Sequence, residues 1–157
     1  MVFRLGSGLL REIEDDYIAK AKAVVESRLY VGEINMSAYD TLKDYLLLEI
    51  ADKAVEIFGV LHLDNENRLL SDDIIFTGTI DTCPVYPRVL LQRALALNAR
   101  GVIIYHNHPG GLCVASPSDH ELTKRLKKVY DIVDISLHDH FLIAGMQAIS
   151  FCEQGWL

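Results

Sequence analysis

The feature that most constrains this chain is a short apolar strand pattern that ends in two histidines and a sharp turn. Val102–Tyr105 leads into His106-Asn107-His108, and Pro109-Gly110-Gly111 follows. Because side chains alternate along a strand, His106 and His108 are expected on one face and Asn107 on the other. Proline and two glycines end such a strand and turn the chain. The pattern therefore predicts two imidazoles side by side at the end of a strand.

Length and charge limit what can surround this strand. The chain has 157 residues, of which 50% are apolar, and this suits one domain with its own core. The formal net charge is −7, whereas nucleic-acid affinity comes mainly from Lys and Arg that neutralise phosphates. The apolar runs are too short to span a membrane, and the N-terminal residues lack a signal-peptide pattern. We expect a cytoplasmic protein without a membrane span.

The three cysteines, Cys83, Cys113 and Cys152, are odd in number and widely spaced. They form neither a disulfide framework nor a pair with the spacing of a zinc knuckle. We expect each of them to be a small buried apolar residue.

Periodicity predicts helices and strands in a mixed order. Helices are expected at 9–29, 37–52, 87–98 and 117–130, and strands at 55–63, 68–79, 101–106, 135–144 and 147–151. Ser37 resembles a helix N-cap, and the helix at 87–98 is nearly apolar all round, which predicts burial. Because hairpins and crossovers both occur, we expect an α/β (α+β) fold with a mixed sheet covered by helices. The first helix precedes this compact pattern and could be a separate arm.

A third candidate ligand follows the two histidines. Asp119 lies eleven residues after His108, within Ser116-Pro117-Ser118-Asp119. Two imidazoles and one carboxylate leave one position of a tetrahedral zinc site open, which is typical of a catalytic zinc. Such a site makes hydroxide available near neutral pH. The same tetrad is also a good helix start with Ser116 as the cap, and the two interpretations are compatible.

The spacing His106-x-His108, seven residues, Ser116, two residues, Asp119 resembles the JAMM signature of the JAB/MPN metallopeptidases. Other segments resemble the bacterial RadC family, namely Phe58–Asn65, Thr77–Asp81, Val85–Arg88, His106–Pro109 and Asp139-His140. The resemblance covers residues 37–155, and the chain is similar to a short, stand-alone RadC-like JAB protein. It implies a RadC-like domain at 37–157 that follows an N-terminal helical extension at 1–36.

The resemblance implies a curved mixed sheet in α-β-α layers and a zinc-dependent hydrolase that cleaves an amide bond. It matches His106, His108 and Asp119 to the ligands of one zinc ion. It matches Ser116 to the serine that supports the tetrahedral oxyanion, and Glu56 to an upstream glutamate that acts as general base. The residues alone favour an idle Glu56 exposed at the edge of its strand. The resemblance instead favours Glu56 as the general base. This role also gives the carboxylate a charged partner, which a carboxylate in an apolar strand needs.

Three departures from the family pattern change the rim of this site without removing a ligand. Gly110-Gly111 stands where Ser-Gly is common, Val89 where Glu is usual, and Leu112-Cys113 near a usual polar position. These departures bear on substrate preference. Cys113 lies between two ligands and is interpreted as a spectator.

The other histidines lack a ligand set of their own. His140 belongs to a second His-x-His, His138-Asp139-His140, that no third ligand accompanies. We interpret His140 as structural, or as a residue that orients a ligand through a hydrogen bond. His62 and His120 are expected in the core or at the surface.

Two non-enzymatic alternatives stay open. A DNA-repair or mobile-element accessory domain is suggested by the traditional naming of the family and by the basic run Lys124, Arg125, Lys127 and Lys128. Such a run is usually a solvated helix face. A metal-bound but inactive interaction module is the other alternative, and the intact ligand set argues against it. The partner expected for the enzyme is a peptide or protein substrate, and the sequence names neither that substrate nor an oligomeric state.

Overall fold

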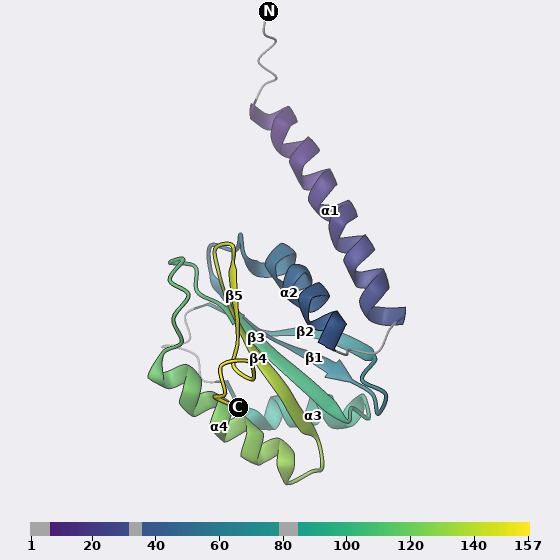
Figure 1. Ribbon diagram of the computed structural model, residues 1–157, viewed down its shortest axis with the longest axis vertical. Helices are drawn as coiled ribbons and strands as arrows, with labels where there is room; N and C mark the ends of the chain where they lie inside the picture. The colour runs from purple at the N-terminus through teal and green to yellow at the C-terminus, as the bar shows by residue number, and fades with distance from the viewer. Residues whose placement is uncertain (1–6, 32–35, 79–84) are drawn as a thin grey trace, which may run out of the picture.

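The computed structural model describes residues 7–31, 36–78 and 85–157, which form four helices and five strands (Figure 1). The helices are α1 (Ser7–Val31), α2 (Met36–Ile50), α3 (Pro87–Ala96) and α4 (Pro117–Asp131). The strands are β1 (Glu56–Leu63), β2 (Leu69–Gly78), β3 (Gly101–Asn107), β4 (Ser136–Ala144) and β5 (Gln147–Ser150). This order confirms the predicted one, and the ends of the elements differ by no more than two residues.

The strands of the described chain form one open mixed sheet in the order β2-β1-β3-β4-β5. β1 is antiparallel to both β2 and β3, β3 is parallel to β4, and β5 is antiparallel to β4. A parallel pair needs a crossover connection, and α4 provides it between β3 and β4. The N-terminus of α4 therefore follows the end of β3 that carries the histidines.

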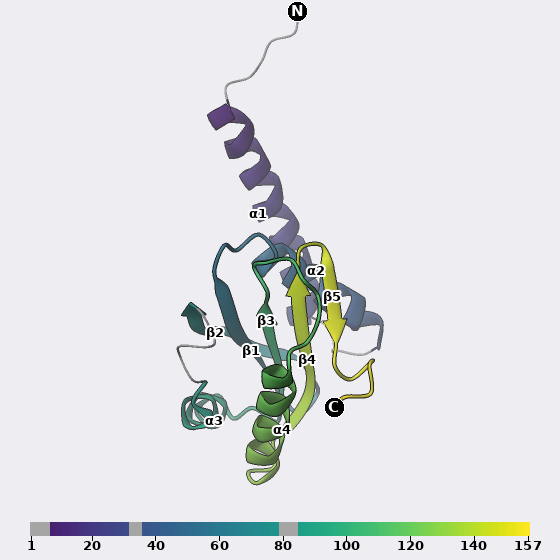
Figure 2. The same cartoon turned by 90° about the vertical axis from the view of Figure 1, so that its left-hand side faces the viewer.

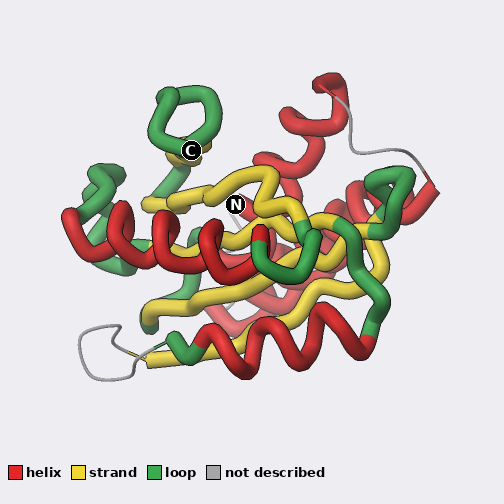
Figure 3. The backbone as a smooth tube through the Cα atoms, turned by 90° about the horizontal axis from the view of Figure 1, so that it is seen from below, coloured by secondary structure: helices red, strands yellow, loops and turns green. Residues whose placement is uncertain are grey.

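Helices cover both faces of the sheet, so the domain has α-β-α layers (Figures 2 and 3). α2 covers one face, and its core includes Leu42, Leu46, Ile50, Leu61, Ile103, Tyr105 and Phe141. α3 and α4 cover the other face, and their core includes Phe58, Val60, Leu90, Val102, Ile104, Leu126 and Tyr130. All residues of β3 are buried because alternate side chains enter the two cores, as expected for a central strand.

The long helix α1 projects beyond the sheet and meets α2 near its own C-terminal end (Figure 1). Lys22 Nζ lies 3.1 Å from Glu49 Oε2, and Val25 packs against the core beneath α2. Ile13 and Tyr17, nearer the N-terminal end of α1, are exposed. These contacts fit an arm that is attached at one end, while the domain boundary after residue 36 stays a prediction. No helix of the described residues is long and apolar enough to cross a membrane.

The prediction that the helix at 87–98 is buried is wrong. In α3, Leu90 and Ala94 are buried, but Val89 and Leu95 are about half exposed. Arg93 reaches from α3 to β2, where its Nε donates to Asp73 Oδ2 at 2.7 Å. A helix that packs on a single sheet needs one apolar stripe, so its other sides face solvent.

Two predictions about single residue types are also wrong. Cys113 is half-buried and Cys152 is exposed, because they lie in the loop after β3 and in the turn after β5. Ser37 is the second residue of α2, which begins at Met36, so it is not the N-cap. Cys83 and the RadC-like residues 79–81 lie outside the described part of the chain.

Candidate metal centre

The end of β3 brings the two predicted histidines together. His106 continues the side-chain row of Val102 and Ile104 on the face that α4 covers. His106 Nε2 and His108 Nε2 are 3.2 Å apart, and the ring centroids are 4.9 Å apart. Both imidazoles therefore point to one place, as strand alternation predicts.

Asn107 points to the opposite side and holds the segment that leads into β1. Its Oδ1 accepts the N–H of Ile57 at 2.6 Å, and its Nδ2 donates to the carbonyl of Val55 at 3.1 Å. These bonds fix Glu56, the first residue of β1, beside the end of β3. A carboxylate oxygen of Glu56 and one ring nitrogen each of His106 and His108 lie within 4.8 Å of one another.

The N-terminus of α4 brings Asp119 to the same place. Ser116 is the N-cap: its Oγ accepts the N–H of Asp119 at 3.2 Å and donates to Asp119 Oδ2 at 2.7 Å. This capping box confirms the predicted helix start and orients the carboxylate. Asp119 Oδ1 lies 3.3 Å from His106 Nε2, and Oδ2 lies 3.6 Å from His108 Nε2. The structure thus gathers the five residues that the sequence analysis singled out.

The surroundings of His108 decide which of its ring nitrogens faces Asp119. Its Nδ1 lies 3.1 Å from the carbonyl oxygen of Leu112, which can only accept, so Nδ1 carries the hydrogen. In the neutral ring, Nε2 then presents a lone pair to the carboxylate of Asp119. Two acceptors at this distance repel each other unless a positive charge lies between them.

The pKa shifts of the partners point to the same demand for positive charge. The neighbouring carboxylate of Asp119 raises the pKa of His108 above its ordinary value. Burial alone would raise the pKa of Asp119, but the imidazoles of His106 and His108 hold it well below its usual range. Imidazole nitrogens with carboxylate oxygens suit a divalent transition-metal ion. The cluster of Glu56, His106 and His108, with Asp119 beside it, could therefore hold a metal ion.

His140 lies behind His106 and is fully buried. Its Nε2 is 2.8 Å from His106 Nδ1, and its Nδ1 is 2.6 Å from Thr123 Oγ1. Burial lowers the pKa of His140 well below its ordinary value. The contact agrees with a His140 that orients His106 through a hydrogen bond. The sequence motifs do not include Thr123, although its position four residues after Asp119 places both residues on one side of a helix.

His62 and His120, which were also singled out from the sequence, lie outside this cluster. His62 is buried, and its Nε2 is 3.3 Å from Asp73 Oδ2. The ring of His120 packs against the rings of Phe151 and Trp156. These contacts agree with core and surface roles for the two residues.

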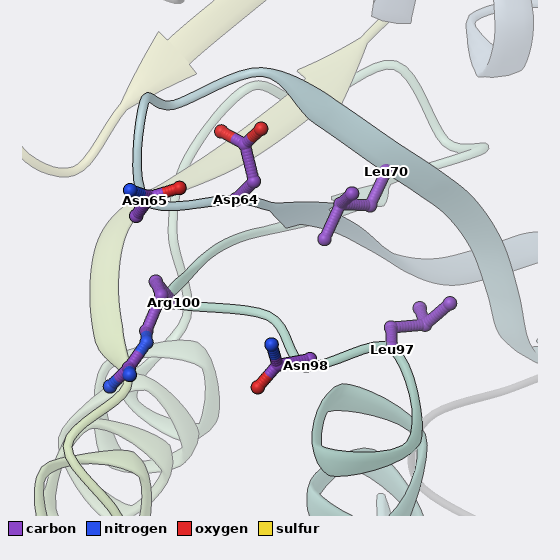
Figure 4. Close-up of a pocket in the computed structure, with 6 residues that line it drawn as sticks. All are labelled: Asp64, Asn65, Leu70, Leu97, Asn98 and Arg100. Atoms are coloured by element: carbon purple, nitrogen blue, oxygen red, sulfur yellow. The ribbon is translucent and has the colours of Figure 1, made fainter.

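A separate hollow of about 290 Å³ lies at the opposite end of β3 (Figure 4). Its lining residues are Asp64, Asn65, Leu70, Leu97, Asn98 and Arg100, and Arg100 directly precedes β3. At about 3.3 Å per residue, roughly 20 Å separate the two ends of this strand. None of these lining residues belongs to the metal centre, so the hollow is a separate feature of the surface.

The open mixed sheet between two layers of helices is consistent with a JAB/MPN-type fold, and the cluster of imidazoles and carboxylates lies at the end of its central strand. Comparisons with known proteins identify the family. A family model described as RadC-like JAB domain matches residues 36–156. Three relatives named UPF0758 protein, from Cellvibrio japonicus, Azotobacter vinelandii and Shewanella baltica, are 37%, 39% and 37% identical to this chain. The matches cover 97%, 88% and 87% of this chain. The chain therefore belongs to the RadC-like JAB domain family.

The matched lengths show how the chain relates to these proteins. It spans 68%, 65% and 60% of the three relatives, so each of them is considerably longer. The match to the Cellvibrio japonicus protein extends over 153 residues and thus takes in most of α1. Similarity to relatives therefore reaches further toward the N-terminus than the resemblance read from residues 37–155.

Proposed function

We propose that this protein is a zinc-dependent hydrolase that cleaves an amide bond in a peptide or protein. The convergence of His106, His108 and Asp119, with Glu56 beside them, is the observation that carries the proposal. Two imidazoles and one carboxylate hold zinc and leave a fourth position open. One zinc ion bound by these residues would supply the Lewis acidity that makes hydroxide available near neutral pH.

Glu56 is the residue we assign to proton transfer. It takes a proton from the attacking water while the water oxygen adds to the amide carbon. When the carbon–nitrogen bond breaks, Glu56 gives this proton to the leaving nitrogen. The products are a carboxylic acid and an amine, and Glu56 returns to its ionised form; the acid then passes its proton to the amine, which leaves as an ammonium ion beside a carboxylate. Its place beside both imidazoles supports this role.

Ser116 is proposed to donate a hydrogen bond to the oxyanion that forms on the amide carbonyl. In the described arrangement its hydroxyl donates to Asp119 Oδ2. The proposed role therefore requires the hydroxyl to turn from the carboxylate to the substrate. The backbone N–H of Ser116, which donates to the same oxygen at 2.7 Å, would keep Asp119 in place during this turn.

The substitution Glu56→Gln tests the proposal, because an amide cannot take up the proton while the three ligands stay in place. Metal analysis should find one zinc ion per chain in the wild type and in the variant. Substrate trapping with Glu56→Gln should capture a protein that the wild type cleaves, with new N-termini detected by mass spectrometry. The rate should fall at least about 100-fold, the usual contribution of a general base.

Glu121→Gln is the matched control, since it changes an exposed carboxylate on α4 and should leave cleavage unchanged. Equal cleavage by Glu56→Gln and the wild type would contradict the assigned base. A wild type that takes up no zinc would contradict the whole proposal.

A DNA-repair or mobile-element accessory role is the second candidate, and it depends on the basic surface of α4. Lys124, Arg125, Lys127 and Lys128 are exposed there. Lys127 Nζ lies 3.8 Å from Asp131 Oδ1, and the formal net charge of the chain is −7. Nearby acids and a negative total both weaken the attraction of phosphates. The contacts thus favour a solvated helix face, and the hydrolase is our conclusion.

A further inference from the structure

Side chains from α4, β4 and β3 form a hydrogen-bonded chain behind the metal centre. Thr123 Oγ1 lies 2.6 Å from the carbonyl oxygen of Asp119 and 2.6 Å from His140 Nδ1. His140 Nε2 in turn lies 2.8 Å from His106 Nδ1. Thr123, His140 and His106 are all buried, so water does not compete for these bonds.

The first step is decided by the carbonyl of Asp119. A carbonyl oxygen can only accept, so the single hydroxyl hydrogen of Thr123 lies between Thr123 Oγ1 and Asp119 O. This is the bond that a helical threonine makes to the residue four positions earlier. Thr123 Oγ1 then has no hydrogen left for His140, and it must accept from His140 Nδ1.

The next steps follow from the neutral state of His140. A buried imidazole whose ring nitrogens face an imidazole and a hydroxyl has no carboxylate to stabilise a charge, so it carries one hydrogen. With that hydrogen on Nδ1, the other nitrogen of His140 must accept from His106 Nδ1. His106 is left with a lone pair on Nε2, the nitrogen that faces His108 and Asp119.

The reverse order of hydrogens is excluded by the same geometry. If Thr123 donated to His140, two oxygens without a hydrogen between them would lie 2.6 Å apart at the Asp119 carbonyl. His140 would then donate to His106 Nδ1, and the hydrogen of His106 would sit on Nε2. A protonated Nε2 cannot bind a metal ion.

The ring of His140 is held so that it cannot leave this chain. The Phe151 ring lies against it with centroids 4.4 Å apart, and the Phe58 ring meets it edge-on at 6.3 Å. Its backbone N–H donates to Asp139 Oδ1 at 2.7 Å, and the N–H of Cys152 donates to the same oxygen at 2.9 Å. Asp139 thereby ties β4 to the segment after β5, which supplies Phe151.

We propose that Thr123 and His140 are positioning residues that hold the hydrogen of His106 on Nδ1 and so prepare its Nε2 for the metal. The proposal rests on the proposed role of His106 as a zinc ligand. It assigns to Thr123 a function that none of the sequence motifs contains. It also gives a role to the fully buried imidazole of His140, which lies between Thr123 and His106.

Thr123→Val is the decisive variant, because it keeps the shape of the side chain and removes the hydroxyl. Thr123→Ser, which keeps the hydroxyl, is the matched control. NMR of zinc-free protein with nitrogen-15 histidine, at about pH 8 where ordinary histidines are neutral, reports which ring nitrogen of His106 carries hydrogen. We expect Nδ1 in the wild type and Thr123→Ser, and a loss of this preference in Thr123→Val. Zinc affinity, measured by competition with a coloured chelator, should fall about 10- to 100-fold in Thr123→Val and stay unchanged in Thr123→Ser.

His140→Phe is a second variant, since it keeps the ring contacts and removes both hydrogen bonds. Circular dichroism identifies variants that fold, and the same loss of affinity is expected from His140→Phe. Hydrogen on Nε2 of His106 in the wild type would overturn the proposal, and so would wild-type zinc affinity in both folded variants. A wild type that binds zinc with the expected tautomer but hydrolyses nothing would overturn the proposed function and support this inference.

Discussion

The sheet carries a polar cluster on each face, and the two clusters differ in how hydrogen-bond donors and acceptors are matched. On the face under α2, Asp72 accepts the hydroxyl hydrogens of Tyr45 and Tyr105, each at 2.5 Å. Gly59 makes room for Tyr105, because a Cβ at Gly59 would overlap its ring. Each donor of this cluster meets an acceptor within the protein. It therefore needs no ligand to be stable.

The centre at the end of β3 is not matched in this way. His106 and His108 direct Nε2 toward the carboxylate of Asp119, while their Nδ1 atoms face His140 and the Leu112 carbonyl. The side that faces the centre thus has acceptors only, and acceptors at such distances are stable around a cation. In this sheet, the balance of hydrogen-bond donors and acceptors therefore distinguishes the binding site from the structural cluster better than burial does.

The largest effect should come from zinc itself. Zinc at about 1,000 times its dissociation constant stabilises a folded protein by about 4 kcal/mol. For a domain of this size that raises the midpoint of thermal unfolding by roughly 8–16 °C. His106→Ala should abolish the increase, whereas Tyr105→Phe, on the other face, should keep it. Calorimetry with and without zinc measures both, and an equal increase in His106→Ala would show that zinc binds elsewhere.

A smaller effect is expected from breaking the matched cluster. Tyr105→Phe removes one of the two hydroxyls that donate to Asp72, and loss of a hydrogen bond to a charged group costs about 1–3 kcal/mol. Urea unfolding measures the change in the free energy of unfolding, and zinc affinity should not change. Tyr86→Phe, at an exposed tyrosine, is the control and should stay within about 0.5 kcal/mol of the wild type. A larger loss in Tyr86→Phe than in Tyr105→Phe would refute the assignment.

The smallest effect is a difference in how two neighbouring carboxylates, Asp72 and Asp73, make the stability of the protein depend on pH. Burial raises the pKa of Asp72, while a hydrogen bond from Arg93 lowers the pKa of Asp73. The unfolded value is about 3.9 for both. A raised pKa in the folded state adds stability below the unfolded value and loses it as pH rises. A lowered pKa adds stability above the unfolded value and loses it as pH falls.

Asp72→Asn and Asp73→Asn should therefore give stability differences from the wild type with opposite slopes. As pH rises above about 4, the difference in the free energy of unfolding between the wild type and Asp72→Asn should shift against the wild type. As pH rises through the range below about 4, the difference between the wild type and Asp73→Asn should shift in favour of the wild type. Urea unfolding at a series of pH values provides both curves. Slopes of the same sign would mean that these two environments do not differ as described.

The parts of the site that depend on local chemistry could be predicted from the sequence. The apolar run before His106 and the alternation of strand side chains were enough to pair it with His108. The spacing of Ser116 and Asp119 predicts a capping box, because a cap uses residues three apart in one turn of helix. Glu56 needed the family resemblance, since residues 56 and 108 meet only through the pairing of β1 with β3.

The parts that depend on packing between elements could not be predicted. Thr123 and His140 meet because α4 lies on β4, and they are 17 residues apart in the chain. Asp72 meets Tyr105 across two strands, and the register of β1 and β2 shifts between Phe58 and Gly59. The exposure of α3 likewise depends on how much of the sheet this helix covers. Helical periodicity in the sequence does not predict that covered area.

Asn107 gives the metal centre a certain independence from the rest of the fold. Its amide holds the carbonyls of Lys53 and Val55 and the N–H of Ile57 from the strand that also carries His106. The place of Glu56 is thus set by β3 and not by the connection that leaves α2. The part of that connection before Lys53 is therefore expected to tolerate an insertion that leaves the carboxylate beside the imidazoles. An engineer who wished to transplant the centre would need to carry over strand ends and one helix start rather than the helices around them.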